Sequence, residues 1–495
     1  MLGRFPFHVA IICQFLFLSI QNVDVSANSP SDVLRVELQS FSSDTSLKNA
    51  SWGFLVTDLQ SGSDLASVNP DLSLIPASTQ KVVTTLTALS LLGNDYRFET
   101  LLQHDGQIAG SVIDGNLIVR GTGDPTFGSR RLHDSLALDS VFASWLKVLR
   151  EMGIKKIRGN IIGDGSAFDE HMVPPRWFWG HIGNAFGAGA HALTANENMY
   201  TVFFRAGKRE GDSAVVVRVV PEIAGMEFIN HVTTGKAGSG DGVIIFGPPY
   251  SNTRWLTGTV PLGANSFGVR GSMPDPGYFV ASEFFRYLEE NGIRIAGEAL
   301  THSSFNNMSS YSDRGTLSRW YSPNLSVIAA RTNLQSLNTY AENIFKTLGL
   351  KIAGEGTFDN GSKVVTRFWN DKGIDTLGMR IHDGSGLSSF NTLTVRQLNK
   401  MLQITHQDTK MLNTLLKGFP VAGHSGTLYG MFRNTKSEGI LMAKSGFLNN
   451  VLAFSGYTRC RDGRPVAFSI IVNNYTGSAP AMRRKIETLL NAIAL

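Results

Sequence analysis

The chain has 495 residues, of which 42% are hydrophobic and 17% charged, a composition that excludes a disordered or fibrous protein. Its formal net charge of +5 is spread along the chain without a basic run, so we expect no nucleic-acid partner. A chain of this length buries a sizeable core and is expected to form about two to four domains.

The first 27 residues are predicted to be a signal peptide. Arg4 precedes an apolar run from Phe5 to about Ile20, and the small residues Val25-Ser26-Ala27 follow it. A basic start, an apolar middle and a small-residue cleavage site are typical of a secretory signal. The alternative is a transmembrane anchor, for which the apolar run is short.

Cysteine and histidine usage gives no sign of a disulfide or a metal. Cys13 lies in the apolar run after Ala10-Ile11-Ile12, whereas a lipid-anchor cysteine normally follows a small residue, so we expect it to be removed with the signal. The mature chain then keeps only Cys460 and forms no intramolecular disulfide. The sequence has no CxxC and no HExxH motif, and we expect no metal site and no cofactor.

A β-hairpin and a helix are predicted first in the mature chain. Residues 52–58 and 64–68 alternate in hydrophobicity around a turn at Ser61-Gly62. A helix follows Pro76 and ends at Gly93. Its apolar positions at helical spacing are Val82, Leu86, Leu89 and Leu92.

Residues 99–311 differ in character from their neighbours. They contain many short β-like runs separated by glycine-rich turns, interrupted by one clear helix in the stretch 276–293. We expect one or two β-rich modules here. From about 315 to 350 the pattern becomes helical, with one apolar stripe along the second part of the segment. The residues of this stripe are Leu334, Leu337, Ala341, Ile344, Phe345 and Leu348.

The C-terminal part is predicted to alternate helix, meander and helix. Residues 394–407 read as a helix, and three strands follow, joined by turns at Asn449-Asn450 and Asp462-Gly463. An amphipathic helix over 479–494 closes the chain.

The candidate chemistry begins at the start of the first helix. Ser78 precedes Lys81 by three positions, so the hydroxyl and the amine share one helix face. A serine needs a base to become a nucleophile, and a partly desolvated lysine can lose its proton and serve as one. The alternative is an N-cap serine beside a solvated lysine, which is the commoner explanation of such a pair.

Two further motifs follow in a recognisable order. Ser336-Leu337-Asn338 lies in the helical segment, and Lys444-Ser445-Gly446 lies on the first strand of the C-terminal meander. The SxN pattern alone is weak evidence, because it recurs at several other serines of the chain, whereas KSG occurs once. The order SxxK, SxN, K[ST]G is that of the penicillin-interacting serine enzymes, with coincidence as the alternative.

The chain resembles the D-alanyl-D-alanine carboxypeptidases of the peptidase S13 family, the penicillin-binding protein 4 type of the low-molecular-mass class C proteins. The resemblance rests on "PASTQK", "RGTGDPTF", "ALTANEN", "GSMPDPGYFVA", "HDGSGLS", "FPVAGHSGTL" and "AKSGFL", and it extends over residues 50–475. It implies an α+β fold with a β-lactamase/D,D-peptidase-like catalytic domain, an antiparallel sheet flanked by helices. That domain would comprise residues 28–98 and 312–495, and residues 99–311 would form a long β-rich insert.

The same resemblance implies a role for each motif residue. Ser78 would be the acylated nucleophile and Lys81 its base. Ser336 would relay a proton to the leaving amine, Asn338 would hold the peptide amide, and Lys444 would lend positive charge.

The resemblance also implies how the substrate is bound. The Ser445 hydroxyl would bind the terminal carboxylate, with Gly446 beside it. The backbone N–H groups of Ser78 and Phe447 would form the oxyanion hole.

Three departures from the family pattern stand out. Leu337 replaces the middle residue of SDN or SNN, and Ser445 replaces the threonine of KTG while keeping the hydroxyl. His181 stands where the family has an aspartate that recognises the amino group of the stem-peptide side chain. A neutral imidazole does not pair with a cationic amine as a carboxylate does, so we expect altered side-chain recognition.

The function implied is a periplasmic serine D-Ala-D-Ala carboxypeptidase and endopeptidase that acts on peptidoglycan peptides and is acylated by β-lactam antibiotics. Loose membrane association and a homodimer are left open. One alternative is a serine β-lactamase, which would need a general base for fast deacylation, and the sequence shows no convincing glutamate motif for it. A second alternative is a catalytically silent peptidoglycan-binding protein. Asp383 is expected to shape a turn near the cleft and not to act as an acid.

Overall fold

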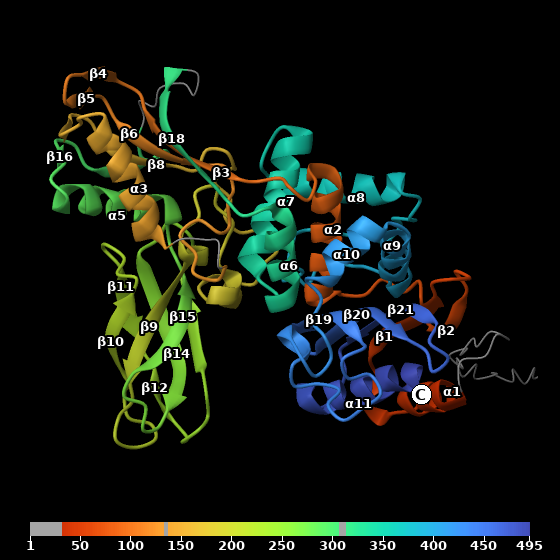
Figure 1. The fold of residues 1–495 in the computed structure, drawn as a ribbon. Coiled ribbons are helices and arrows are strands. Elements are labelled where there is room, and N and C mark those ends of the chain that lie inside the picture. The colour runs from red at the N-terminus through yellow and green to blue at the C-terminus, as the bar shows by residue number, and fades with distance from the viewer. Residues whose placement is uncertain (1–31, 133–136, 306–312) are drawn as a thin grey trace, which may run out of the picture.

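The structure is a computed structural model that describes residues 32–132, 137–305 and 313–495. The predicted signal peptide, residues 1–27, lies outside these ranges. Among the described helices, none has the length and apolar character needed to cross a membrane. The ribbon shows a helix-and-sheet region that contains the C-terminus and, beside it, a second region rich in strands (Figure 1).

The first region is built on a five-stranded antiparallel sheet in the order β19-β20-β21-β1-β2. The predicted N-terminal hairpin and C-terminal meander join there, because β1 pairs with β21 along its whole length. Both predictions are confirmed. The strands are β1 (Ser51–Asp58), β2 (Asp64–Val68), β19 (Met442–Leu448), β20 (Val451–Arg459) and β21 (Pro465–Asn473).

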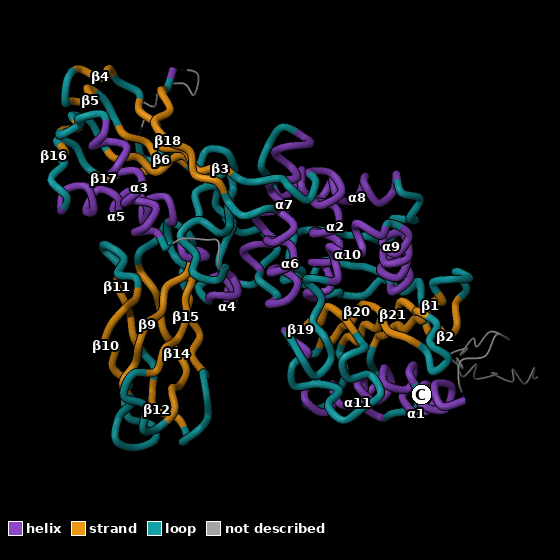
Figure 2. The backbone as a smooth tube through the Cα atoms, in the orientation of Figure 1, coloured by secondary structure: helices purple, strands orange, loops and turns teal. Residues whose placement is uncertain are grey.

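Helices cover both faces of this sheet (Figure 2). Alternate side chains of β1 point to opposite faces: Trp52 and Phe54 join the apolar cluster under α1 and α11, whereas Leu55 joins the cluster around α2. The predicted α+β class, a sheet flanked by helices, is confirmed. The helices are α1 (Asp32–Ser42), α2 (Gln80–Leu92), α6 (Leu325–Gln335), α7 (Asn338–Ala353), α8 (Phe358–Asp371), α9 (Val395–Gln407), α10 (Thr409–Leu416) and α11 (Ala479–Asn491).

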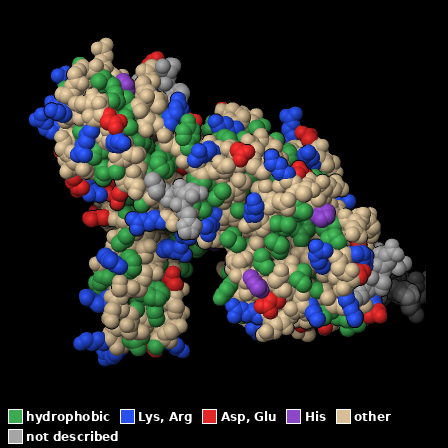
Figure 3. Space-filling view, viewed as in Figure 1, with side chains coloured by type: hydrophobic (Ala, Val, Ile, Leu, Met, Phe, Trp, Pro, Cys, Tyr) green, Lys and Arg blue, Asp and Glu red, His purple; other side chains and the backbone are tan. Residues whose placement is uncertain are grey.

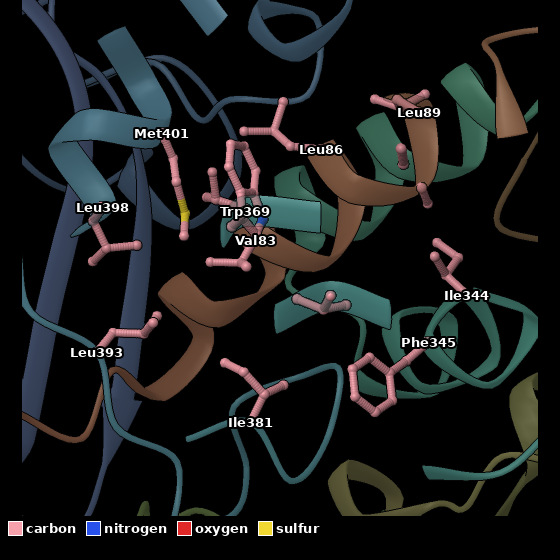
Figure 4. Close-up of a cluster of buried hydrophobic side chains, with 14 of the residues drawn as sticks. Val83, Leu86, Leu89, Ile344, Phe345, Trp369, Ile381, Leu393, Leu398 and Met401 are labelled. Atoms are coloured by element: carbon pink, nitrogen blue, oxygen red, sulfur yellow. The ribbon is translucent and has the colours of Figure 1, made fainter. Parts of the chain in front are cut away.

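Helix α2 lies at the centre of the helical layer. Every residue from Gln80 to Leu89 is buried, as expected of a helix surrounded by other elements, and the helix ends at Gly93, whose φ is 89°. Figure 4 shows apolar side chains from several helices and loops gathered around it. The labelled members are Val83, Leu86, Leu89, Ile344, Phe345, Trp369, Ile381, Leu393, Leu398 and Met401. The start of α2 is therefore held on a rigid support.

The strand-rich region has an upper and a lower lobe in Figure 1. The upper lobe holds the sheets β17-β8-β6-β3-β18 and β16-β7-β5-β4, with a core of aromatic rings from α3 and α5. Its elements are β3 (Glu99–His104), β4 (Gln107–Ala109), β5 (Val112–Asp114), β6 (Leu117–Gly121), α3 (Leu138–Glu151), β7 (Lys156–Ile157), β8 (Ile161–Asp164), α5 (Pro276–Glu290), β16 (Arg294–Ile295), β17 (Ala299–Thr301) and β18 (Gly315–Tyr321).

The lower lobe holds the sheets β10-β9-β15 and β11-β14-β12, with β13 paired to β14. Lysine and arginine side chains are scattered over the visible face of both regions, in keeping with a charge excess spread along the chain (Figure 3). The strands are β9 (Met199–Arg205), β10 (Val215–Val220), β11 (Glu227–Asn230), β12 (Thr233–Gly235), β13 (Gly242–Phe246), β14 (Thr253–Pro261) and β15 (Phe267–Ser272). The short helix α4 (Trp179–Ile182) contacts β13 and lies beside the upper end of this lobe (Figure 2).

Three sequence predictions need correction. Residues 315–321 are not helical: they form β18, which pairs with β3. The helical segment that follows is not continuous, because Ser336 has a left-handed φ of 57° and separates α6 from α7. The upper lobe also contains α3, a second helix where the pattern predicted one. Since β18 belongs to the sheet of the upper lobe, we propose that the insert ends near residue 321 and not at 311.

Candidate active site

Ser78 lies on a tight turn in front of α2. The turn is a 3₁₀ helix over Ala77–Thr79, and Ala77 has a left-handed φ of 46°. Gly386 packs against this turn so closely that an added Cβ atom would lie 1.9 Å from the Ala77 carbonyl oxygen. Strained backbone of this kind persists only where the surroundings hold it, and it clusters at functional sites. The turn thus presents Ser78 in a fixed position.

Lys81 is completely buried and makes three hydrogen bonds. Its Nζ donates to Ser78 Oγ at 2.9 Å, to Asn338 Oδ1 at 2.6 Å and to the Ser385 carbonyl oxygen at 2.8 Å. Burial lowers the pKa of Lys81 to about 7, against the opposing charges of Glu342 and Asp383. The neutral amine, which can accept a proton, is therefore accessible near neutral pH.

The SxN motif connects two lysines. Ser336 ends α6 and Asn338 begins α7, so the break between the helices turns both side chains to the same cleft. Asn338 binds Lys81 and also donates from Nδ2 to the Phe186 carbonyl oxygen at 2.7 Å. Ser336 Oγ accepts from Lys444 Nζ at 2.9 Å. Residues far apart in the chain thus meet as predicted from the three motifs.

The KSG motif lies on β19, the edge strand beside the turn of Ser78. Lys444 is buried, and desolvation together with the charge of Lys81 holds its pKa well below the usual range. Ser445 Oγ donates to Thr427 Oγ1 at 2.6 Å. A Cβ atom added to Gly446 would lie 2.9 Å from the Ser78 amide nitrogen, which shows how closely the strand passes the turn. The next residue, Phe447, is about half exposed.

Two buried carboxylates support the loop that touches Lys81. Asp383 accepts from the N–H groups of Gly386 and Ser388, so the prediction that it shapes a turn is confirmed. Glu342 accepts from the N–H groups of Gly384 and Ser385 at 2.8 and 2.9 Å. The motifs did not predict Glu342, although its position four residues after Asn338 on α7 places both on one helix face.

His181 lies in α4 and is connected to the SxN motif through Phe186, whose carbonyl oxygen accepts from Asn338. Its ring contacts the rings of Phe178 and Phe186, each with centroids 5.4 Å apart, and burial lowers its pKa. The imidazole is therefore neutral at neutral pH, and its ring packs against two aromatic rings. Within the described residues, no group of histidine, cysteine and acidic side chains could hold a metal ion.

A cavity of about 260 Å³ adjoins the motif residues Ser336 and Asn338. Arg131, Arg270 and Glu197 contribute charged side chains to its wall. A larger cavity of about 610 Å³ lies near Phe168, at a distance from the cleft, and none of the motif residues lines it. The smaller cavity is the one that extends the candidate site.

Comparison with known proteins agrees with this geometry. The model of the D-Ala-D-Ala carboxypeptidase 3 (S13) family matches residues 34–493. The D-alanyl-D-alanine carboxypeptidase of Actinomadura sp. (strain R39) is 30% identical over 467 residues, which cover 90% of this chain and 82% of that protein. The D-alanyl-D-alanine carboxypeptidase DacB of Haemophilus influenzae is 26% identical, covering 86% of this chain and 85% of its own.

A solved structure shows the same fold. The crystal structure of penicillin binding protein 4 (dacB) from Haemophilus influenzae superimposes with a TM-score of 0.80 at 23% identity, covering 92% of this chain and 99% of that one. The resemblance drawn from the sequence motifs is confirmed. With the family match spanning nearly the whole chain, the protein belongs to the D-Ala-D-Ala carboxypeptidase 3 (S13) family of serine-type peptidases.

Proposed function

We propose that Ser78 is the nucleophile of a D-Ala-D-Ala carboxypeptidase and endopeptidase reaction, with Lys81 as its base. The observation that carries the proposal is the 2.9 Å contact between Lys81 Nζ and Ser78 Oγ at a fully buried amine. Neutral Lys81 accepts the hydroxyl proton while Ser78 Oγ attacks the carbonyl carbon of the penultimate D-Ala. The tetrahedral adduct then expels the terminal D-Ala amine, and an ester remains on Ser78.

Ser336 is proposed to carry the proton to the leaving amine, because Lys444 Nζ donates to its Oγ and leaves the hydroxyl hydrogen free to face the cleft. Water then hydrolyses the ester by the reverse proton path. Asn338 is proposed to bind the peptide amide, and Ser445 the terminal carboxylate. The oxyanion is proposed to lie between the N–H groups of Ser78 and Phe447, which the close packing of β19 on the turn supports.

Gly446→Ala tests this oxyanion arrangement. The new Cβ atom would lie 2.8 Å from the Pro76 carbonyl oxygen and 2.9 Å from the Ser78 nitrogen, so β19 must move away from the turn. We expect acylation by benzylpenicillin to slow by about tenfold or more, as loss of one oxyanion donor does, with a small fall in Tm.

The matched control is Gly430→Ala. Gly430 is exposed, and an added Cβ atom there would meet nothing within 4 Å. Its acylation rate is expected to equal that of the wild type. A Gly446→Ala variant that acylates at the wild-type rate would contradict the proposed path of β19 through the site.

We also propose a substrate class, a class of inhibitor, a cellular compartment and domain bounds. Peptidoglycan stem peptides are the substrate class, and β-lactams are acylating inhibitors, a proposal supported by the solved complex of Haemophilus influenzae penicillin binding protein 4 with a β-lactam. We place the protein in the periplasm, exported by the signal peptide predicted over 1–27. The catalytic domain is proposed to comprise residues 28–98 and about 322–495, with 99–321 as the insert.

The proposed function is tested with purified protein and two substrates, a stem pentapeptide ending in D-Ala-D-Ala and a cross-linked muropeptide dimer. Chromatography with mass detection is expected to show free D-Ala from the first and monomers from the second. A pentapeptide ending in L-Ala-L-Ala is the control and should remain intact. If a folded protein leaves both D-Ala substrates unchanged, the proposal is wrong.

A further inference from the structure

We propose that Glu342 is a positioning residue for the reaction: it holds the Ser385 carbonyl against Lys81 and places a negative charge beside the Lys81 amine. The inference rests on the role of Lys81 as base proposed above and adds a residue to it. Glu342 acts through Lys81 and the loop at 383–386, since its own hydrogen bonds go to that loop.

The geometry of Glu342 fits the ionised form. The side chain is completely buried on α7, yet both carboxylate oxygens have a donor: Oε2 accepts from Gly384 N–H and Oε1 from Ser385 N–H. A carboxylate accepts at both oxygens, whereas a protonated acid would need an acceptor for its own hydrogen. Two backbone donors therefore stabilise the anion in a place where burial alone opposes it.

The loop at 383–386 connects Glu342 to Lys81. The Ser385 peptide group donates its N–H to Glu342, and its carbonyl oxygen accepts from Lys81 Nζ at 2.8 Å. The neighbouring Gly384 carbonyl oxygen accepts from Thr84 Oγ1 on α2 at 2.7 Å. The loop is thus bound to α7 through Glu342 and to α2 through Lys81 and Thr84. Without the carboxylate, two buried N–H groups would lose their acceptor.

Charged groups act on Lys81 from three of the elements around it. Lys444 faces it from β19, Asp383 from the loop, and Glu342 from α7. One turn further along α7, Lys346 is paired with Asp169 at 2.5 Å. Two negative charges favour the protonated amine of Lys81, and the effect of Glu342 is larger than that of Asp383. Removing the Glu342 carboxylate leaves less negative charge near Lys81 to balance the neighbouring Lys444.

The two groups titrate as a linked pair. Burial and the charge of Asp383 raise the pKa of Glu342, whereas its two N–H donors and Lys81 favour the anion. Because both Glu342 oxygens already accept from backbone N–H groups, we place the first proton that the pair takes up on Lys81, where the Glu342 anion stabilises it. In a Glu342→Gln variant this stabilisation is lost, so Lys81 stays neutral, and competent as a base, to a lower pH.

The test measures the second-order rate constant of acylation by benzylpenicillin between about pH 5 and 9. For Glu342→Gln we expect the midpoint of the acid limb to fall by about one pH unit and the plateau to fall by about tenfold or more. Glu342→Asp keeps the charge, so its midpoint should stay at the wild-type value while the plateau falls. Asp124→Asn, a buried carboxylate of the insert bound to Thr126, is the matched control and should leave both unchanged.

Thermal melting identifies variants that are folded. A folded Glu342→Gln variant with an unchanged midpoint overturns the charge effect, and one with an unchanged plateau overturns the positioning role. If Glu342→Gln does not fold, Glu342→Asp decides: a lower plateau at the wild-type midpoint supports the proposal, and a wild-type plateau or a shifted midpoint overturns it. A wild-type protein that forms no adduct at any pH contradicts the proposed function itself, before any variant is compared.

Discussion

Replacing Ser78 by alanine is expected to abolish the covalent penicillin adduct and to lower D-Ala release by about a thousandfold or more. In the proposed reaction the Ser78 hydroxyl forms the ester, and Lys81 already contacts it. The alanine variant should keep the Ala77–Thr79 turn, because the side-chain hydrogen bond that closes this turn comes from Thr79 and not from Ser78. Thr79 Oγ1 donates to the Pro76 carbonyl oxygen at 2.7 Å.

The measurement is intact-mass spectrometry after brief incubation with benzylpenicillin. The wild type should gain the mass of one penicillin, and Ser78→Ala should gain none. Ser90→Ala provides a matched control, since Ser90 lies on the same helix with an exposed side chain. A persistent adduct on Ser78→Ala would assign the nucleophile to another residue.

The wild type alone discriminates among the three functions that the sequence left open. A stable adduct identifies a slowly deacylating penicillin-binding enzyme. Antibiotic that is consumed while no adduct accumulates would indicate a serine β-lactamase. Antibiotic that stays intact beside an unmodified protein would indicate a catalytically silent peptidoglycan-binding protein.

The SxxK pair was predictable because its geometry is local. A separation of three residues, from the 3₁₀ turn of Ser78 to the first turn of α2, allows Ser78 and Lys81 to meet, and the structure shows that contact. The contact of Lys81 with Asn338 joins residues 257 positions apart. Spacing alone could not predict it, and only the resemblance to a known family brought the three motifs to one cleft.

The mispredicted elements have identifiable causes. The apolar stripe of residues 334–348 runs across the break at Ser336, because α6 and α7 bury their apolar side chains in the same core. The pattern therefore conceals a left-handed residue at the point where the active site needs one. Strand β18 is formed by pairing with β3, about two hundred positions earlier, where Gln103 donates to Thr316. Such pairing leaves little local signal.

Glu342 escaped prediction for a related reason. Its partners are backbone N–H groups of Gly384 and Ser385, and any residue type supplies these, so no motif marks the contact. The one feature of the sequence that could have indicated Glu342 is its position four residues after Asn338. On a helix, this spacing places both side chains on the same face.

Acylation is expected to depend on pH with a midpoint near 7. Below its pKa of about 7 Lys81 is protonated and cannot accept the Ser78 proton, so the rate should fall about tenfold per pH unit. Above the midpoint the neutral amine predominates and the rate reaches a plateau. The direction follows from burial, which disfavours the charged amine and brings the pKa down from 10.5.

Lys81→Arg separates the base from the positive charge. A guanidinium stays protonated throughout this pH range, so the variant keeps a cation beside Ser78 and loses the proton acceptor. We expect its acylation rate to be lower by about a thousandfold or more at every pH, without the rise near pH 7. Stopped-flow measurements with a fluorescent penicillin over about pH 5 to 9 would show both profiles. A wild-type rate that does not vary with pH would mean that a group other than Lys81 takes the proton of Ser78, despite the contact between Lys81 Nζ and Ser78 Oγ.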